Sequence, residues 1–335
     1  MITGPWTRGA YFAEDARTVT DDGVANVMRC FRQHFLSVSE HPHEALLHSM
    51  SQVLCDEELL DPKPVTAIPV STESPVVHLH VQKSGGSSLN EMLVRAYTPT
   101  RSRTGDETEL LRLAKVDPST PALYFGHLNA DVLERLPSGA RGVVMLRDPV
   151  ARLRSAYQYY CALDPNGPEG HRLVKKAHAC ADLHEFLQDP FVRASLETWN
   201  HQTWVVAGAR RWQRWLRALQ AQSGNDRVVY LETEVLPELR QSLQGLHFVG
   251  FFEQFDADAG ALLRQLGHSH EGPVPRLNTL NDARDRNSRA ADQRTDLARG
   301  SLESALIEEY TMIDAVLYRE AISQRHTRHA GSLGR

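Results

Sequence analysis

The chain has 335 residues, a formal net charge of −5 and 41% hydrophobic residues. This length suffices for one large α/β domain with additions, or for two domains. A mildly acidic chain has no general affinity for nucleic acid, so any anion site must be built locally. No apolar run approaches the length of a membrane span, and the N-terminus lacks the apolar core of a signal peptide. We therefore expect a cytoplasmic protein with no nucleic-acid or membrane partner.

The metal-binding side chains do not form a recognisable motif. Sixteen histidines are present, but no H-E-x-x-H or C-x-x-C spacing gathers them. The four cysteines are widely spread, and we expect them to stay reduced thiols: Cys30, Cys55, Cys161 and Cys180.

Residues 1–70 are interpreted as a helical N-terminal extension. Apolar residues recur at helical spacing from Val24 to Phe35 and again from about His43 to Leu54. Prolines between Pro62 and Pro75 then mark a linker. We expect residues 71–335 to form the main domain, and the extension either to pack on it or to dock a partner protein.

Predicted strands and helices alternate through the main domain. Apolar runs predict strands at 76–81, 122–125, 142–146 and 227–231, and a further run spans 246–252. Apolar residues at helical spacing lie within 89–96, 150–160, 197–222, 256–267 and 302–322. The remaining segments are a polar stretch with a short helix (98–121), an insertion with two helical patches (161–195) and a loop (268–300). This order predicts an α/β fold, a P-loop-like parallel sheet wrapped by helices, with the ligand at the carboxyl ends of the strands.

One strand–turn–helix stretch has the character of a phosphate site. After the strand at 76–81 comes a turn of small residues, namely Lys83, Ser84, Gly85, Gly86, Ser87 and Ser88. Glycines let the backbone approach a phosphate, and the loop N–H groups and the helix N-terminus attract its charge. The spacing matches neither the Walker A loop, in which Lys follows the glycines, nor G-x-G-x-x-G. The alternative is a glycine turn that only links a strand to a helix.

A second stretch, LRDPVARLRSAY at 146–157, follows another predicted strand. Arg147 leaves the strand end, and Ser155 lies two turns into the next helix, so that both could bind a second phosphate. Pro149 suits the first helical turn, where its missing N–H is not needed. The alternative is that Arg147 pairs with Asp148 and that Ser155 is a surface residue.

Together the two stretches resemble the PAPS-dependent sulfotransferases. That family has P-K-[ST]-G-G-[ST]-[ST] and L-R-D-P-x-x-R-x-x-S-x-[YF]; here the stretches read QKSGGSSL and LRDPVARLRSAY, with Gln82 in place of the proline. The resemblance covers about residues 75–320. Further local matches are similar to the carbohydrate branch, which includes heparan 2-O and uronyl enzymes and bacterial relatives: Gly126-His127, Asn200-x-Gln202-Thr203 and Asp314-x-x-Leu317-Tyr318.

The resemblance implies a role for each motif. Lys83 and the residues from Ser84 to Ser88 would bind the 5′-phosphosulfate of PAPS, while Arg147 and Ser155 would bind its 3′-phosphate. His127 would be the general base that takes the proton of the acceptor hydroxyl, a task that suits a neutral imidazole. No metal would be required, and PAP would be released. His78 and His80 are rival histidines that we expect in the core or behind the site.

The acceptor stays open at this point. The resemblance favours a sugar hydroxyl, but an intracellular glycoconjugate, a lipid-linked sugar or a secondary metabolite is equally compatible. A polyketide-type acyl chain is a further alternative, for which residues 1–70 could dock a carrier domain. Trp199 or Trp204 could line an acceptor site or simply pack. Two other functions are possible: a P-loop-type ATP-dependent kinase or NTPase, for which Asp148 is the one candidate Mg²⁺ ligand, and a non-catalytic nucleotide-binding protein on the same fold.

Overall fold

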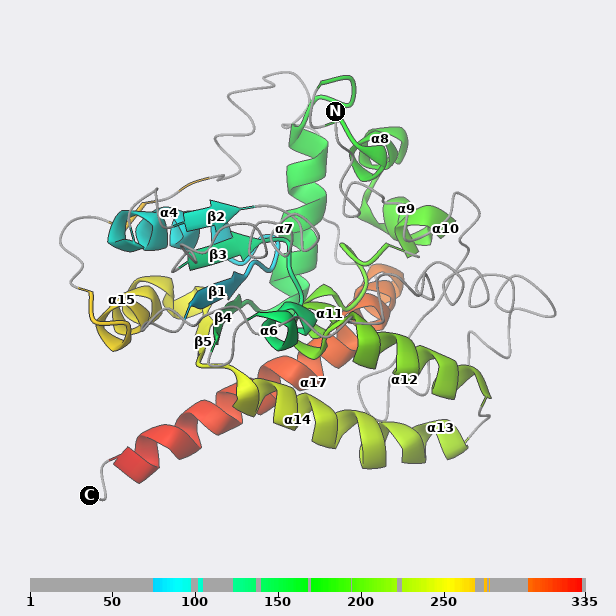
Figure 1. The fold of residues 1–335 in the computed structure, drawn as a ribbon. Helices are drawn as coiled ribbons and strands as arrows, with labels where there is room; N and C mark the ends of the chain where they lie inside the picture. Colours follow the sequence, from blue (N-terminus) through cyan, green and yellow to red (C-terminus); the bar gives the residue numbers. More distant parts are fainter. Residues whose placement is uncertain are drawn as a thin grey trace.

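A parallel five-stranded sheet forms the centre of the molecule (Figure 1). The computed structural model describes residues 75–97, 102–104, 123–136, 140–167, 170–193, 195–221, 225–268, 274–275, 277 and 301–332. The strands are β1 (Val76–Leu79), β2 (Ser102–Thr104), β3 (Leu123–Gly126), β4 (Arg141–Leu146) and β5 (Phe248–Phe251). Their order is β2-β3-β1-β4-β5, and all neighbours run parallel. The predicted α/β fold with a parallel sheet wrapped by helices is therefore confirmed.

Helices cover both faces of this sheet, which explains why all four residues of β1 are buried. On one face α4 (Gly86–Tyr97) and α15 (Phe255–Gln265) pack on alternate strand residues such as Val76 and Val143. On the other face α7 (Pro149–Ala162) packs on the residues between them, such as Val77 and Val144. Figure 1 shows these helices on either side of the strands.

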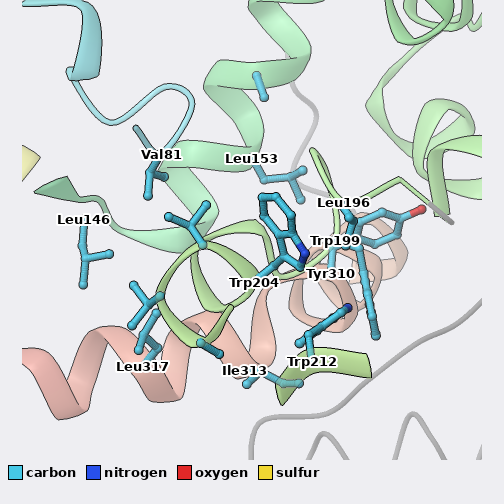
Figure 2. Packing of buried hydrophobic residues seen from close by; sticks show 14 of the residues in the cluster. Val81, Leu146, Leu153, Leu196, Trp199, Trp204, Trp212, Tyr310, Ile313 and Leu317 are labelled. Atoms are coloured by element: carbon cyan, nitrogen blue, oxygen red, sulfur yellow. The ribbon is translucent and has the colours of Figure 1, made fainter. Parts of the chain in front are cut away.

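The second face continues into a large helical layer. Its further helices are α6 (Asp131–Arg135), α8 (Arg172–Ala179), α9 (Leu183–Gln188), α10 (Pro190–Arg193), α11 (His201–Ala207), α12 (Ala209–Ala221), α13 (Asn225–Tyr230), α14 (Leu236–Gly245) and α17 (Ser301–Ser332). Trp199, Trp204 and Trp212 are buried where α11, α12 and α17 meet (Figure 2). These tryptophans therefore pack in the core.

Buried hydrogen bonds join α11 to α17. Asn200, which has a left-handed backbone with φ 43°, accepts from the N–H groups of Ile313 and Asp314 through Oδ1. In return the Asp314 carboxylate accepts from the N–H groups of Gln202 and Thr203 at the start of α11. The sequence matches at 200–203 and 314 thus lie in one structural contact between two helices.

One predicted strand is wrong. Residues 227–231 form the end of α13 and the start of a π-helix, Leu231–Val235, which continues into α14. The residues RVVYL have high β-propensity, but Val229 is 54% exposed, while Leu231, Val235, Leu239 and Leu243 are buried at a spacing of four. This helical period extends beyond the short apolar run, so burial of one helical face decides the structure.

The other predicted segments agree with the structure where it describes them. The apolar run at 246–252 contains strand β5, and the insertion at 161–195 holds three short helices rather than two. Edge strand β2 was not predicted, because its residues, Ser102–Thr104, are polar. The extension at 1–70, the short helix within 98–121 and nearly all of the loop at 268–300 lie outside the described residues. No helix in the described part is long and apolar enough to cross a membrane.

Candidate active site

The predicted site residues follow three neighbouring strands. Lys83 comes after β1, His127 directly follows β3, and Arg147 directly follows β4. Because β3, β1 and β4 are adjacent and parallel, their carboxyl ends meet at one edge of the sheet. The His80 N–H donates to the Gly126 carbonyl at 3.1 Å and so extends the pairing of β1 with β3 toward the site.

The loop after β1 has the compact backbone that a phosphate site needs. Lys83 and Gly85 both have positive φ, 63° and 79°, which is costly for a lysine. A Cβ on Gly85 would lie 2.8 Å from Phe255, and one on Gly86 would overlap the ring of His80. Both glycines are thus required by close packing. The helix α4 begins at Gly86, so the N–H groups of its first turn have no helical acceptor.

The serines of the loop differ in their surroundings. Ser84 is fully buried, and its Oγ has no hydrogen-bond partner among the described residues. Ser88 is buried as well, but its Oγ accepts from the Leu277 N–H at 3.0 Å. Of the two buried hydroxyls, that of Ser84 is the one without any hydrogen bond to a described residue.

Lys83 and Arg147 come together across the site. The Arg147 Nη1 donates to the Lys83 carbonyl at 2.8 Å, and its guanidinium lies over the Phe252 ring at 4.4 Å. The Lys83 ammonium lies over the Tyr159 ring at 3.8 Å. The Arg147 side chain therefore reaches the backbone of the loop, and each of the two cations lies over an aromatic ring.

The backbone of Arg147 is fixed by one side-chain amide. Gln202 accepts from the Arg147 N–H through Oε1 and donates to the Arg147 carbonyl through Nε2, both at 2.9 Å. Burial lowers the pKa of Arg147, while the negative charge of Glu253 acts in the opposite direction. Sequence reasoning noted Gln202 only as a family match and missed Tyr159, Phe252 and Glu253, because their contacts join distant segments.

The predicted alternative for the second motif, an Arg147–Asp148 pair, is not what the structure contains. The Asp148 carboxylate accepts from the Ala151 N–H at 2.8 Å and so caps α7, while the Arg147 guanidinium contacts Lys83. Ser155 is half-buried on α7, and its hydroxyl makes no hydrogen bond with any described residue. The structure therefore joins Arg147 to the loop by a hydrogen bond but gives the Ser155 hydroxyl no hydrogen bond to a described residue.

Three histidine rings form a stack at the ends of β1 and β3. His80 stacks on His78 with centroids 5.6 Å apart and on His127 with centroids 4.9 Å apart. His78 is fully buried and contacts the Asn90 side chain; burial lowers its pKa to about 4. Burial also holds the pKa of His80 well below 6.5, and the charges of neighbouring basic groups lower it further.

His127 is the exposed member of this stack. Protein atoms crowd its ring, and this desolvation lowers the pKa of His127 below 6.5, while the charge of Glu197 and a hydrogen bond to the His80 backbone raise it. As the most exposed residue of the three, His127 is the histidine best placed to take a proton from an acceptor. The expectation that His78 and His80 lie in the core or behind the site agrees with their positions.

A further carboxylate was not foreseen from the sequence. Glu197 Oε2 accepts from the Tyr160 hydroxyl at 3.1 Å, and this hydroxyl also lies 3.5 Å from Gln82 Oε1, beside the loop. Glu197 is half-buried, in the segment between α10 and α11. No motif marks this residue, since only the fold brings its charge near enough to raise the pKa of His127.

A comparison with models of known protein families gives the family of this chain. Residues 67–318, about three quarters of the chain, match the model of the Sulfotransferase family. A comparison with curated proteins gave no match. Among the described residues, no group of three or more His, Cys, Asp or Glu side chains is arranged to hold a metal ion. The chain belongs to the sulfotransferase family, whose chemistry is the transfer of a sulfuryl group.

Proposed function

We propose that the chain transfers the sulfuryl group of PAPS to a hydroxyl group and releases PAP. The proposal rests on one observation: the loop at 83–88, Arg147 and His127 lie at the ends of three adjacent strands, and Arg147 is hydrogen-bonded to the loop at the Lys83 carbonyl. A loop suited to bind the anionic group of a donor, a second anion-binding side chain and a candidate base thus lie at one edge of the sheet.

The loop and Arg147 suit a nucleotide with two separate phosphate groups. Lys83 and the N–H groups and hydroxyls from Ser84 to Ser88 would bind the 5′-phosphosulfate, as helix N-termini bind anions. Arg147 would bind the 3′-phosphate, and Ser155 would join it there after a change in side-chain position. Supporting this, Ser84 Oγ and Arg147 Nε are buried polar atoms without a hydrogen-bond partner among the described residues, and such atoms are costly unless a ligand satisfies them.

His127 would act as the general base. As the acceptor oxygen forms its bond to sulfur, the bond between sulfur and the bridging oxygen breaks, and the hydroxyl proton passes to His127. The electron pair of the broken bond leaves with PAP, whose developing charge Lys83 stabilises. Positioning and charge stabilisation would dominate the rate, as in phosphoryl transfer with a loose transition state.

The acceptor is proposed by class only. The matches at 126–127, 200–203 and 314–318 favour a sugar hydroxyl of the kind used by the carbohydrate branch, in a small molecule or a glycan. A secondary metabolite or a carrier-bound acyl chain is the second choice, with the segment at 1–70 docking the carrier or another partner protein. The cytoplasmic location also stays a prediction.

Nucleotide binding is the first test. We expect PAP to raise the melting temperature of the full chain without Mg²⁺, and calorimetry to show that AMP, which lacks the 3′-phosphate, binds at least tenfold more weakly. ATP with Mg²⁺ serves as the control for a kinase or NTPase. Tighter binding of ATP–Mg²⁺ than of PAP would contradict the proposal, and so would no response to PAP. Transfer from labelled PAPS to a panel of hydroxyl acceptors then tests the reaction.

A further inference from the structure

Arg147 lies one residue beyond the paired part of β4. The last pair of β4 with β5 joins Leu146 to Phe251, so the ladder of the sheet ends just before Arg147. The Gln202 side chain continues this pairing: its Oε1 accepts from the Arg147 N–H and its Nε2 donates to the Arg147 carbonyl, both at 2.9 Å. One amide group thus binds both backbone groups of this residue, as a neighbouring strand would.

The peptide bond between Arg147 and Asp148 is held on both sides. Its carbonyl oxygen is the one that Gln202 binds, and its N–H donates to Glu253 Oε1 at 2.8 Å. A peptide whose donor and acceptor are both bound by side chains cannot rotate without breaking a hydrogen bond. The direction in which the Arg147 side chain leaves the backbone is therefore fixed by Gln202 and Glu253.

Both of these side chains are themselves anchored on α17. The Gln202 N–H donates to Asp314 Oδ2 at 3.2 Å, and Asp314 is fully buried. The Tyr318 hydroxyl donates to Glu253 Oε2 at 2.8 Å. Because Asp314 and Tyr318 are four residues apart, they lie on the same face of the helix. One helix thus sets the positions of both side chains that hold the Arg147 backbone.

The guanidinium of Arg147 is held between β5 and the phosphate loop. It lies over the Phe252 ring at 4.4 Å, and its Nη1 donates to the Lys83 carbonyl at 2.8 Å. Phe252 packs against the loop as well, since a Cβ on Gly85 would lie 3.0 Å from its ring. The Arg147 Nε is a buried donor without a hydrogen-bond partner among the described residues. The backbone clamp thus presents a fixed guanidinium that can still donate to a ligand.

We propose that Gln202 and Glu253 are positioning residues that set the preference of the site for a nucleotide with a second phosphate group. The inference rests on the proposed function, in which Arg147 binds the 3′-phosphate of PAPS. Both phosphates belong to one molecule, so Arg147 selects the second only if its guanidinium lies at a fixed place relative to the loop. A carboxylate repels phosphate, so Glu253 contributes through position and not through charge.

The test compares the affinity of the full chain for PAP with that for AMP, which lacks the 3′-phosphate, by calorimetry. In Gln202→Met, which keeps the size of the side chain but removes the amide, we expect PAP affinity to fall about tenfold and AMP affinity to change less than about twofold. KM for PAPS should rise about tenfold with kcat nearly unchanged, since the 3′-phosphate does not react. The matched control is Gln213→Met, at a buried glutamine of α12, which should alter neither affinity.

Glu253 allows position to be separated from charge. Glu253→Gln keeps an oxygen that can accept from the Asp148 N–H, whereas Glu253→Ala removes the charge and the acceptor together. We expect Glu253→Gln to bind PAP at least as tightly as the unmodified chain, and Glu253→Ala to bind it about threefold more weakly than Glu253→Gln. Equal PAP affinities in these two variants would overturn the role of Glu253. Because Glu253 is exposed, both variants should fold even where Gln202→Met does not.

The outcomes distinguish this inference from the proposed function. If the unmodified chain prefers PAP to AMP and Gln202→Met keeps the whole preference, the inference is overturned and the proposed function stands. Equal losses of PAP and AMP affinity in Gln202→Met would also overturn it, because they would indicate a general structural defect and not a displaced Arg147. If the unmodified chain shows no preference for PAP, the proposed function fails and the inference fails with it.

Discussion

At the scale of single residues, the same imidazole ring occurs in three environments along one stack. His78 is buried and hydrogen-bonded, His80 is enclosed between two rings, and His127 is the exposed residue of the three, under the influence of the Glu197 charge. A base must be neutral to accept a proton, and desolvation keeps His127 neutral at physiological pH. The environment, more than the residue type, thus separates the proposed base from its two neighbours.

The pH dependence of turnover should reflect this. With a pKa of His127 below 6.5, kcat/KM should be level near pH 7 and fall tenfold per pH unit below that pKa, because the protonated ring cannot accept a proton. The His127→Ala variant should lose at least a hundredfold in kcat and lack the acid limb. His184→Ala replaces a histidine of α9 that is hydrogen-bonded to Gln188 at the surface, and it should keep the original profile. An identical acid limb in His127→Ala would assign the base elsewhere.

Lys83 offers a test of function separate from folding. Lys83→Ala should lower kcat on the order of a hundredfold, because the charge on departing PAP is no longer neutralised. Its stability should change by less than about 1 kcal/mol, the value of a partly exposed cation–π contact such as that with Tyr159. Lys175→Ala, at an exposed position of α8, is the control and should keep full activity. Equal losses of stability and activity in Lys83→Ala would indicate a structural lysine.

The residues of the site were predictable only where the motif is continuous. The loop at 83–88 and Arg147 each follow an apolar strand, and strand, turn and helix leave a local pattern in the sequence. Glu197 and Tyr160 reach the site from segments distant from the loop, so no spacing indicates them, and Gln202 was noted only through a family match. Ser155 shows the opposite case, a motif residue whose hydroxyl has no hydrogen bond to any described residue.

At the scale of elements, the strand–loop–helix unit depends on close packing at Gly86. Gly86→Ala should lower stability by about 1–3 kcal/mol and weaken PAP binding, because its Cβ would overlap His80 and push the loop away. Gly245→Ala, at the end of α14 with nothing within 4 Å, should be neutral or slightly stabilising, since alanine favours helix. Urea unfolding and PAP titration of both variants check this. Equal stability in the two variants would show that the loop tolerates a side chain.

The contact between α11 and α17 is a second element on which the site depends. Asp314→Ala removes the acceptor for the N–H groups of Gln202 and Thr203, and Gln202 in turn holds Arg147. Leaving buried donors unpaired should cost on the order of 3 kcal/mol. Urea unfolding measures this, with Asp226→Ala on the exposed side of α13 as the control. A loss below about 0.5 kcal/mol would mean that α11 keeps its start without this cap.

Element prediction succeeded where burial and local pattern agree. The strands β1, β3 and β4 are short apolar runs at the centre of the sheet, and both faces of each are covered. The segment at 227–231 has the same composition, yet a longer helical pattern that continues through Leu239 and Leu243 determines its structure. Within these five residues only the β-branched composition is apparent, whereas the structure is determined by burial of the whole amphipathic helical face.

At the scale of the whole molecule, buried neutral histidines make stability depend on pH. His78, His80 and His201 all have a pKa below 6.5 in the folded state, chiefly because burial disfavours the charged ring. In the unfolded chain each would titrate near 6.5. Between these two values the unfolded state binds more protons, so the free energy of unfolding falls as the pH falls below about 6.5.

His78 has a pKa of about 4 in the folded state and near 6.5 in the unfolded chain, a difference that contributes about 3 kcal/mol to the free energy of unfolding. This contribution is fully present above pH 6.5 and is lost by about pH 4. Urea unfolding at pH 7.5 and at pH 5 should therefore show a marked loss at the lower pH. In His78→Gln, where the amide can still reach Asn90, that loss should shrink by about 1–2 kcal/mol, because one proton-binding group of the unfolded chain is gone. His171→Gln, which replaces an exposed histidine before α8, should keep the pH dependence of the unmodified chain. If His78→Gln and His171→Gln lose stability equally between the two pH values, burial of the histidine stack does not control the acid sensitivity of this fold.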